Sequence, residues 1–249
     1  MSRLSESQKA SFMHWNYAHR GLHSADKKVP ENSLAAFRLA REAGYGYELD
    51  VQFSSDRKVV VFHDDTLKRV TGVDGRVDSL SYDELSQLHL FNSGETIPLF
   101  SEVLKAVNGG GPLIVELKSG PNNDELCNET LKLLRNYSGI YCIESFDPRI
   151  VNWFRKNAPD IVRGQLSAPY ENMKSDTGEP FISFLLSRCF FSFINKPDFI
   201  AYKIGKRPGH VLRMRKKGIM LFGWTARKSP SPEDNDGVIF EHYHPECRF

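Results

Sequence analysis

The stretch YELDV, residues 47–51, alternates apolar and acidic side chains as a half-buried β-strand does. Because successive side chains of a strand point to opposite faces, Glu48 and Asp50 share one face and the apolar residues share the other. A later stretch, LIVELK, follows the same pattern, with Glu116 and Lys118 on one face. We expect the two apolar faces to pack on helices and the four ionisable groups to converge inside a barrel.

Short β-rich runs recur on both sides of these two stretches, with helix-patterned segments between them. This alternation is typical of repeated βα units and a parallel sheet. Eight parallel strands close naturally into a barrel, so we predict an α/β fold of the (β/α)8 TIM type, with a doubly wound sheet as the alternative. The predicted strands lie near residues 16–19, 47–51, 113–117, 140–143, 161–165, 199–202, 220–224 and 238–240.

One helix between the strands can be placed residue by residue. Asn32 is expected to cap a helix over residues 33–43, and Gly44 is expected to end it. Its apolar stripe, expected to face the core, consists of Leu34, Phe37, Leu39 and Ala40.

The stretch 58–98 breaks the βα rhythm. It offers a hairpin-like run at residues 59–62 and a short helix over residues 81–89, which Ser81 and Glu84 begin as a capping box. We interpret residues 64–98, approximately, as a small insertion after strand two within a single barrel domain spanning residues 1–249. The polar stretch 227–236 predicts that the last βα unit is reduced to a turn.

Composition narrows the function classes. The formal net charge is +2, and no basic stripe with interleaved aromatics stands out, so nucleic acid is a poor candidate partner. The most apolar region, residues 181–194, is interrupted by Arg188 and is shorter than the roughly 20 residues of a membrane span. Residues 1–15 lack the apolar stretch of a secretory signal, which predicts a cytoplasmic protein. The four scattered cysteines form no C-x-x-C pair and are expected to be free thiols.

The converging carboxylates suggest a metal site. Like charges brought together away from water are costly unless a cation neutralises them. Ligands that are all oxygen suit Mg²⁺ or Ca²⁺ better than zinc. A buried ion-pair network with Lys118 explains the spacing equally well.

Two histidines add acid–base chemistry. His19 follows the first predicted strand, and His63 ends the apolar run 59–62. Both are expected at the C-terminal rim of the barrel, where active sites of this fold lie. Facing a carboxylate-lined site, they are natural general base and general acid near neutral pH.

Five strings in order resemble the signature of the glycerophosphodiester phosphodiesterase family in its bacterial, cytoplasmic type. They are HRG (19–21), PEN (30–32), ELD (48–50), HDDTLKR (63–69) and ELK (116–118), with supporting matches at Ser145-Phe146, Gln165 and Gly223-Trp224-Thr225. The resemblance extends from about Tyr17 to Pro245.

The resemblance implies roles for the matching residues. Glu48, Asp50 and Glu116 would hold one divalent cation, and His19 and His63 would be the acid–base pair. The residues implied to contact the phosphate or the rest of the substrate are Arg20, Lys118, Glu31, Gln165 and Trp224. Glu31 either touches metal and substrate or only orients Arg20.

The implied activity is hydrolysis of glycerophosphodiesters, such as glycerophosphocholine or glycerophosphoethanolamine, to sn-glycerol 3-phosphate and an alcohol. The alternatives are a phospholipase C- or D-like enzyme acting on lipids and a barrel that binds phosphodiesters without turnover. Two departures from the family pattern concern substrate contacts: Ala226-Arg227 follows Trp224-Thr225, and Glu241 replaces the usual late Asp.

A phenylalanine-rich segment at residues 181–193 remains outside these roles. It is a candidate contact for a lipid or for a second copy of the chain in a homodimer. So many aromatic residues near a strand are more often packed into the core.

Overall fold

The computed structural model describes residues 3–230 and 234–249, except the side chains of residues 176 and 177. Eight strands pair in parallel, and β1 pairs with both β2 and β9, so the sheet closes on itself. The predicted barrel is therefore confirmed, and the doubly wound alternative is wrong because an open sheet leaves its edge strands unpaired. The barrel strands are β1 (Asn16–Ala18), β2 (Gly46–Phe53), β4 (Leu113–Leu117), β5 (Tyr141–Ser145), β6 (Val162–Ser167), β7 (Phe199–Lys203), β8 (Met220–Ala226) and β9 (Gly237–Phe240).

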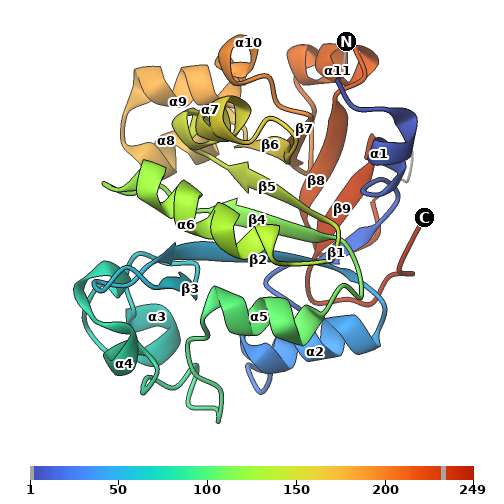
Figure 1. Cartoon of the computed structure of the whole chain (residues 1–249). Helices are drawn as coiled ribbons and strands as arrows, with labels where there is room; N and C mark the ends of the chain where they lie inside the picture. Colours follow the sequence, from blue (N-terminus) through green and yellow to red (C-terminus); the bar gives the residue numbers. More distant parts are fainter. Residues whose placement is uncertain (1–2, 231–233) are drawn as a thin grey trace.

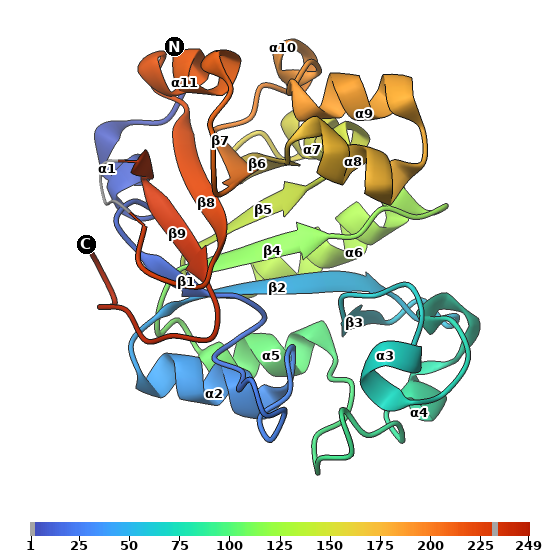
Figure 2. The ribbon, with the colours of Figure 1, turned by 180° about the vertical axis from the view of Figure 1, so that it is seen from behind.

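Helices surround this barrel, as Figures 1 and 2 show from opposite sides. Their bounds are α1 (Glu6–Ala10), α2 (Leu34–Glu42), α5 (Phe100–Val107), α6 (Asn123–Arg135), α7 (Pro148–Asn157), α8 (Tyr170–Thr177), α9 (Pro180–Ser187), α10 (Ser192–Asn195) and α11 (Gly209–Lys216). Among the described residues, no helix is long and apolar enough to cross a bilayer.

The two faces of β2 behave as the alternation predicts. Tyr47, Leu49 and Val51 are buried in the layer between barrel and helices, where they join Phe37 of α2 and Phe100 of α5. A second apolar cluster fills the barrel interior with side chains that include Tyr17, Ile114, Phe199 and Phe222. The polar residues of the interior face lie toward the C-terminal ends of the strands.

Helix α2 corrects two sequence predictions. Ser33, not Asn32, is the N-cap: its hydroxyl accepts a hydrogen bond from the Ala36 amide, while Asn32 adopts φ +56° and turns its side chain toward the barrel. Leu39 is exposed, because it lies about 200° around the helix from buried Phe37.

The segment after β2 forms a small subdomain with its own apolar cluster. β3 (Val59–Val61) pairs antiparallel with β2, and α3 (Lys68–Thr71), η1 (Val77–Ser79) and α4 (Tyr82–Leu85) follow. The capping box of Ser81 and Glu84 is present. The helix ends at Leu85 rather than His89, because the next residues turn so that Leu90 packs in this cluster.

The predicted turn at residues 227–236 and the predicted free cysteines can each be compared with the structure. Among the residues described between β8 and β9, no α-helix is present; residues 231–233 of the predicted turn lie outside the described part. All four cysteines are free, as predicted.

The core interpretation of the phenylalanine-rich segment is wrong. Phe181 of α9 is 72% exposed and Phe193 of α10 is 65% exposed. These short helices lie outside the barrel, and their outer sides are not covered by any described element.

Candidate active site

The C-terminal half of the barrel interior gathers three buried carboxylates. β2 and β4 are parallel neighbours with Asp50 opposite Glu116, and Glu48 lies two residues earlier on the same face. One oxygen from each of Glu48, Asp50 and Glu116 lies within 4.8 Å of the others. The structure therefore brings together the three residues that the sequence pattern predicts to converge.

The electrostatics of this cluster fit a hard cation. Burial raises the pKa of Glu48 well above its ordinary value, and the charges of Asp50 and Glu116 raise it further. Asp50 Oδ1 is buried and accepts no hydrogen bond from the described residues, although Lys118 Nζ lies 3.5 Å from it. Carboxylate oxygens are the ligands that Mg²⁺ and Ca²⁺ prefer, and a bound cation would offset the repulsion between these buried carboxylates.

Lys118 belongs to the same cluster. Its ammonium donates a hydrogen bond of 2.8 Å to Glu116 Oε1. Burial alone would lower the pKa of Lys118, but Glu116 and Asp50 together raise it, so the side chain is cationic. Arg20 is the second cation of the cluster, with its Nε 3.4 Å from Asp50 Oδ2.

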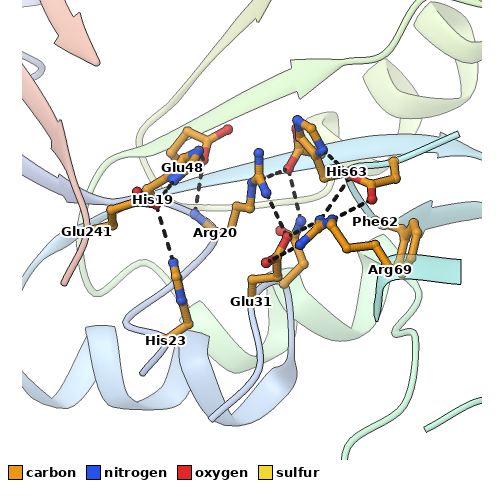
Figure 3. Close-up of polar contacts among 12 residues, drawn as sticks. His19, Arg20, His23, Glu31, Glu48, Phe62, His63, Arg69 and Glu241 are labelled. Atoms are coloured by element: carbon orange, nitrogen blue, oxygen red, sulfur yellow. Dashed lines mark hydrogen bonds and ion pairs between the residues drawn. The ribbon is translucent and has the colours of Figure 1, made fainter. Parts of the chain in front are cut away.

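His19 lies at the end of β1, between two acids (Figure 3). Its Nδ1 is 2.8 Å from Glu241 Oε2, and its Nε2 is 3.9 Å from Glu48 Oε2. The pKa of Glu241 is lowered by its contacts with His19, His23 and Arg227 in spite of burial, so its carboxylate is the acceptor and His19 Nδ1 is the donor. Burial, aided by the charge of Arg20, lowers the pKa of His19 to about 4, which leaves Nε2 unprotonated at neutral pH.

The turn after His19 aims Arg20 into the site. Arg20 has φ +53°, and its backbone amide donates to Glu48 Oε2 at 3.0 Å. Gly21 follows at φ +77°, where a Cβ would lie 2.8 Å from the Cβ of Ala36, so only glycine permits this close approach to α2. The HRG string is thus explained by backbone geometry as well as by side-chain chemistry.

Glu31 pairs with two arginines, as Figure 3 shows. Arg20 Nη1 donates to Glu31 Oε1 at 2.6 Å, and Arg69 donates to both of its oxygens at 2.7 and 2.9 Å. Despite burial, these arginines lower the pKa of Glu31 to about 2. These contacts favour the orienting role for Glu31 over contact with a metal.

His63 lies across the site from His19, at the end of the run that forms β3. Its Nδ1 is 2.6 Å from Asp64 Oδ1, and Asp64 accepts two hydrogen bonds from Arg69. Arg69 therefore joins Asp64 to Glu31 and connects the inserted segment to the loop before α2.

A cavity of about 1000 Å³ opens beside His63 and Lys118. The loop after β5 contributes Phe146, which packs edge-on against the ring of Trp224 at 5.6 Å between centroids. Trp224 thus lies behind Phe146 and does not itself line the cavity, so its contact with substrate stays a prediction.

Gln165 does not join the site. Its side-chain amide donates to backbone carbonyls of Ser145, Phe146 and Leu166, and its oxygen accepts from Asn195 of α10. It points outward from β6 and is expected to support the loop that carries Phe146 rather than to contact substrate.

Several site residues escaped the sequence analysis. Asn32 donates to Asp50 Oδ2 at 2.9 Å, and Asp64 and Arg69 hold His63 and Glu31. Glu144 of β5 lies opposite Glu116, is 1% exposed, and has a pKa raised mainly by burial. The alternation in YCIES could have revealed Glu144, because it places Glu144 on the face opposite the outward-facing Ile143.

A parallel eight-stranded barrel with buried carboxylates, one histidine directly after β1 and a second after β3 of the inserted segment defines a (β/α)8-barrel enzyme. The sequence profile of the glycerophosphoryl diester phosphodiesterase family matches residues 19–242. The protein YhdW of Bacillus subtilis is 31% identical over 217 residues, which cover 84% of each chain. The glycerophosphodiester phosphodiesterase of Caldanaerobacter subterraneus is 30% identical, with 89% of this chain and 91% of that one covered. The chain therefore belongs to the glycerophosphoryl diester phosphodiesterase family and is a phosphoric diester hydrolase.

Solved structures agree on the fold. A phosphodiesterase of Oleispira antarctica, in complex with the product sn-glycerol-3-phosphate, has a TM-score of 0.76 at 22% identity, covering 93% of this chain and 94% of the other. A glycerophosphodiester phosphodiesterase of Thermotoga maritima has a TM-score of 0.67 at 28% identity, covering 90% and 92%.

Proposed function

We propose that this protein hydrolyses small glycerophosphodiesters, such as glycerophosphocholine or glycerophosphoethanolamine, to sn-glycerol 3-phosphate and an alcohol. The observation that carries the proposal is the convergence of Glu48, Asp50 and Glu116 between His19 and His63 in a chain of this family. The product named in the Oleispira antarctica complex is consistent with it.

We assign Glu48, Asp50 and Glu116 as ligands of one divalent cation, Mg²⁺ or Ca²⁺. Such a cation, when bound, supplies positive charge that polarises the phosphate and favours ionisation of a neighbouring hydroxyl. The chain itself supplies Arg20 and Lys118, whose charges face the same carboxylates and stabilise negative charge that develops on the phosphoryl oxygens.

His19 is suited to act as the base. The hydrogen bond from Nδ1 to Glu241 leaves Nε2 as the nitrogen that can take a proton, and the Glu241 carboxylate compensates the imidazolium that forms. We propose that it accepts the proton of the glycerol hydroxyl next to the phosphate, and that this oxygen attacks phosphorus.

His63 is the matching acid. Asp64 beside it compensates the charge of an imidazolium, which gives its proton to the alcohol as the phosphorus–oxygen bond breaks. Water then opens the cyclic phosphate to glycerol 3-phosphate.

The direct test measures glycerol 3-phosphate released from glycerophosphocholine and glycerophosphoethanolamine by a coupled dehydrogenase assay, with Mg²⁺, with Ca²⁺ and with chelator. We expect release with one or both cations and none with chelator. Release that persists in chelator refutes the metal assignment. Binding without release from either substrate refutes the hydrolytic proposal and supports a phosphodiester-binding barrel.

The cytoplasmic location and the homodimer stay predictions.

A further inference from the structure

His23, in the loop between β1 and α2, is a buried histidine whose ring has no hydrogen-bond partner. Its side chain is only 4% exposed, and neither ring nitrogen forms a hydrogen bond with any described residue. Such atoms are rare in folded proteins, because burial removes their hydrogen bonds to water without replacing them. The ring of His23 therefore indicates a bound group as its partner.

Two further donor groups face this ring. His23 Nε2 lies 3.8 Å from Glu241 Oε2, and the same oxygen lies 2.8 Å from His19 Nδ1. One donor atom from each of the three residues lies within 4.8 Å of the other two. Figure 3 shows His23 pointing from its loop toward the pair formed by Glu241 and His19. The three side chains thus converge on one point beside the first and last strands of the barrel.

The chemistry of these donors fits zinc. Two imidazoles and one carboxylate are a donor set of zinc sites, whereas Mg²⁺ and Ca²⁺ prefer oxygen ligands alone. Zinc bonds of about 2.0–2.1 Å at tetrahedral angles separate neighbouring donor atoms by roughly 3.3 Å. The separations of 2.8 and 3.8 Å around Glu241 Oε2 lie on either side of this value. Shifts of roughly half an ångström would therefore accommodate the ion between these atoms.

The basic residues around the cluster are paired with acids. Arg227 donates to Glu241 Oε1 at 2.8 Å, which leaves Oε2 facing the two histidines. Its side chain is 75% exposed, so solvent screens much of its repulsion of a cation. Arg20 and Lys27 both pair with Glu31, at 2.6 and 3.9 Å. The surrounding charge is thus compatible with a cation at Glu241.

We propose that His23, Glu241 and His19 form a zinc site, separate from the three carboxylates, and that zinc bound there switches the enzyme off. Zinc on Nδ1 of His19 displaces the proton of that nitrogen, and the neutral ring then carries its proton on Nε2. The proton moves from one nitrogen to the other through solvent, so none is gained or lost overall. Because Nε2 is the proposed proton acceptor, this switch rests on the proposed function, whereas the site does not.

Zinc binding is tested without any substrate, by titration calorimetry of protein saturated with Mg²⁺. We expect one Zn²⁺ per chain in the wild type. His23→Phe should weaken zinc binding roughly 100-fold or more, because loss of a residue that only orients a ligand already costs about 10–100-fold. The matched control is His89→Phe, at an exposed histidine of the inserted segment, and it should bind zinc as the wild type does. Equal zinc affinity in the wild type and His23→Phe overturns the proposed site.

X-ray absorption at the zinc edge examines the wild type directly, so this test does not depend on a variant that folds. Coordination that includes two imidazole nitrogens is expected. A shell of oxygen alone places the ion among Glu48, Asp50 and Glu116 and overturns the proposal.

The switch is tested by turnover of glycerophosphocholine at saturating Mg²⁺, with each variant compared with its own zinc-free rate. Saturating zinc should lower kcat of the wild type and of His89→Phe roughly 10²-fold or more, the usual contribution of a general base, and should leave His23→Phe at its own rate. Relief of the wild-type inhibition by more Mg²⁺, with equal inhibition of His23→Phe, assigns zinc to the carboxylates and overturns the switch. Absence of turnover under every condition refutes the proposed function, whereas the calorimetric result still decides the zinc site.

Discussion

Glu241, directly after the last strand, holds His19, directly after the first, through a contact of 2.8 Å between Oε2 and Nδ1. Glu241 in turn accepts a hydrogen bond from Arg227 at 2.8 Å and lies 3.8 Å from His23. The two departures from the family pattern, Arg227 and Glu241, are therefore partners of each other, and together they orient a proposed catalytic base.

Replacing Glu241 with Gln should lower kcat roughly 10–100-fold, the usual effect of losing the group that orients an active-site histidine. KM should change little, since Glu241 does not face the cavity. Exposed Glu246→Gln is the control, and Glu241→Asp should recover part of the rate. A normal kcat in Glu241→Gln would show that the contact is only structural.

His19→Ala and His63→Ala should each reduce turnover roughly 10²–10⁴-fold, because each removes one proton transfer. Steady-state assays with glycerophosphocholine measure the loss, and circular dichroism checks the fold. His89→Ala, at an exposed position in the inserted segment, should keep full activity. Wild-type turnover in either site variant would disprove its assignment.

Glu48→Gln and Glu116→Gln should weaken divalent-cation affinity, because each removes one charged oxygen donor from the cluster. Titration calorimetry on chelator-treated protein measures this directly. Unchanged cation binding would support the alternative interpretation, in which these carboxylates form only an ion-pair network with Lys118.

Glu31 should make stability depend on pH in the acid range. Its pKa in the folded protein is lowered from 4.5 to about 2, which corresponds to stabilisation on the order of 3 kcal/mol at neutral pH. Since the folded-state pKa is the lower one, this stabilisation is present above pH 4.5 and is lost as pH falls toward 2.

Urea unfolding of wild type and Glu31→Gln between pH 7 and 2.5 measures this difference, with exposed Glu42→Gln as control. The wild type should be more stable at pH 7, and the gap should narrow as the pH falls. A gap that stays constant would rule out the charge of Glu31 as its cause.

Local patterns predicted much of this molecule. Alternation in Tyr47–Val51 predicted that Glu48 and Asp50 lie inside the barrel and Leu49 in the outer layer, because successive side chains of a strand point to opposite faces. The capping box at Ser81 could also be predicted from the sequence, since it depends only on Ser81 and on Glu84 three residues later.

Contacts between residues far apart in the chain could not be predicted from the sequence. The pairing of Glu241 with His19 joins residues 222 positions apart, and Arg69 reaches Glu31 across 38. The exposure of Phe181 was mispredicted because composition does not show which side of α9 a neighbour covers. Asn32 could cap α2 by residue type, but its side-chain nitrogen donates to Asp50, and Ser33 supplies the cap instead.

The closure of the barrel through β1 also sets an order of assembly during translation. β1 can pair with β2 early, but its other edge stays open until β9 has left the ribosome. His19 gains its orienting carboxylate only then, so a nascent chain that already carries Glu48, Asp50 and Glu116 still lacks the contact that positions the proposed base. The proposed base is thus positioned only after the strands that carry the three carboxylates have been made.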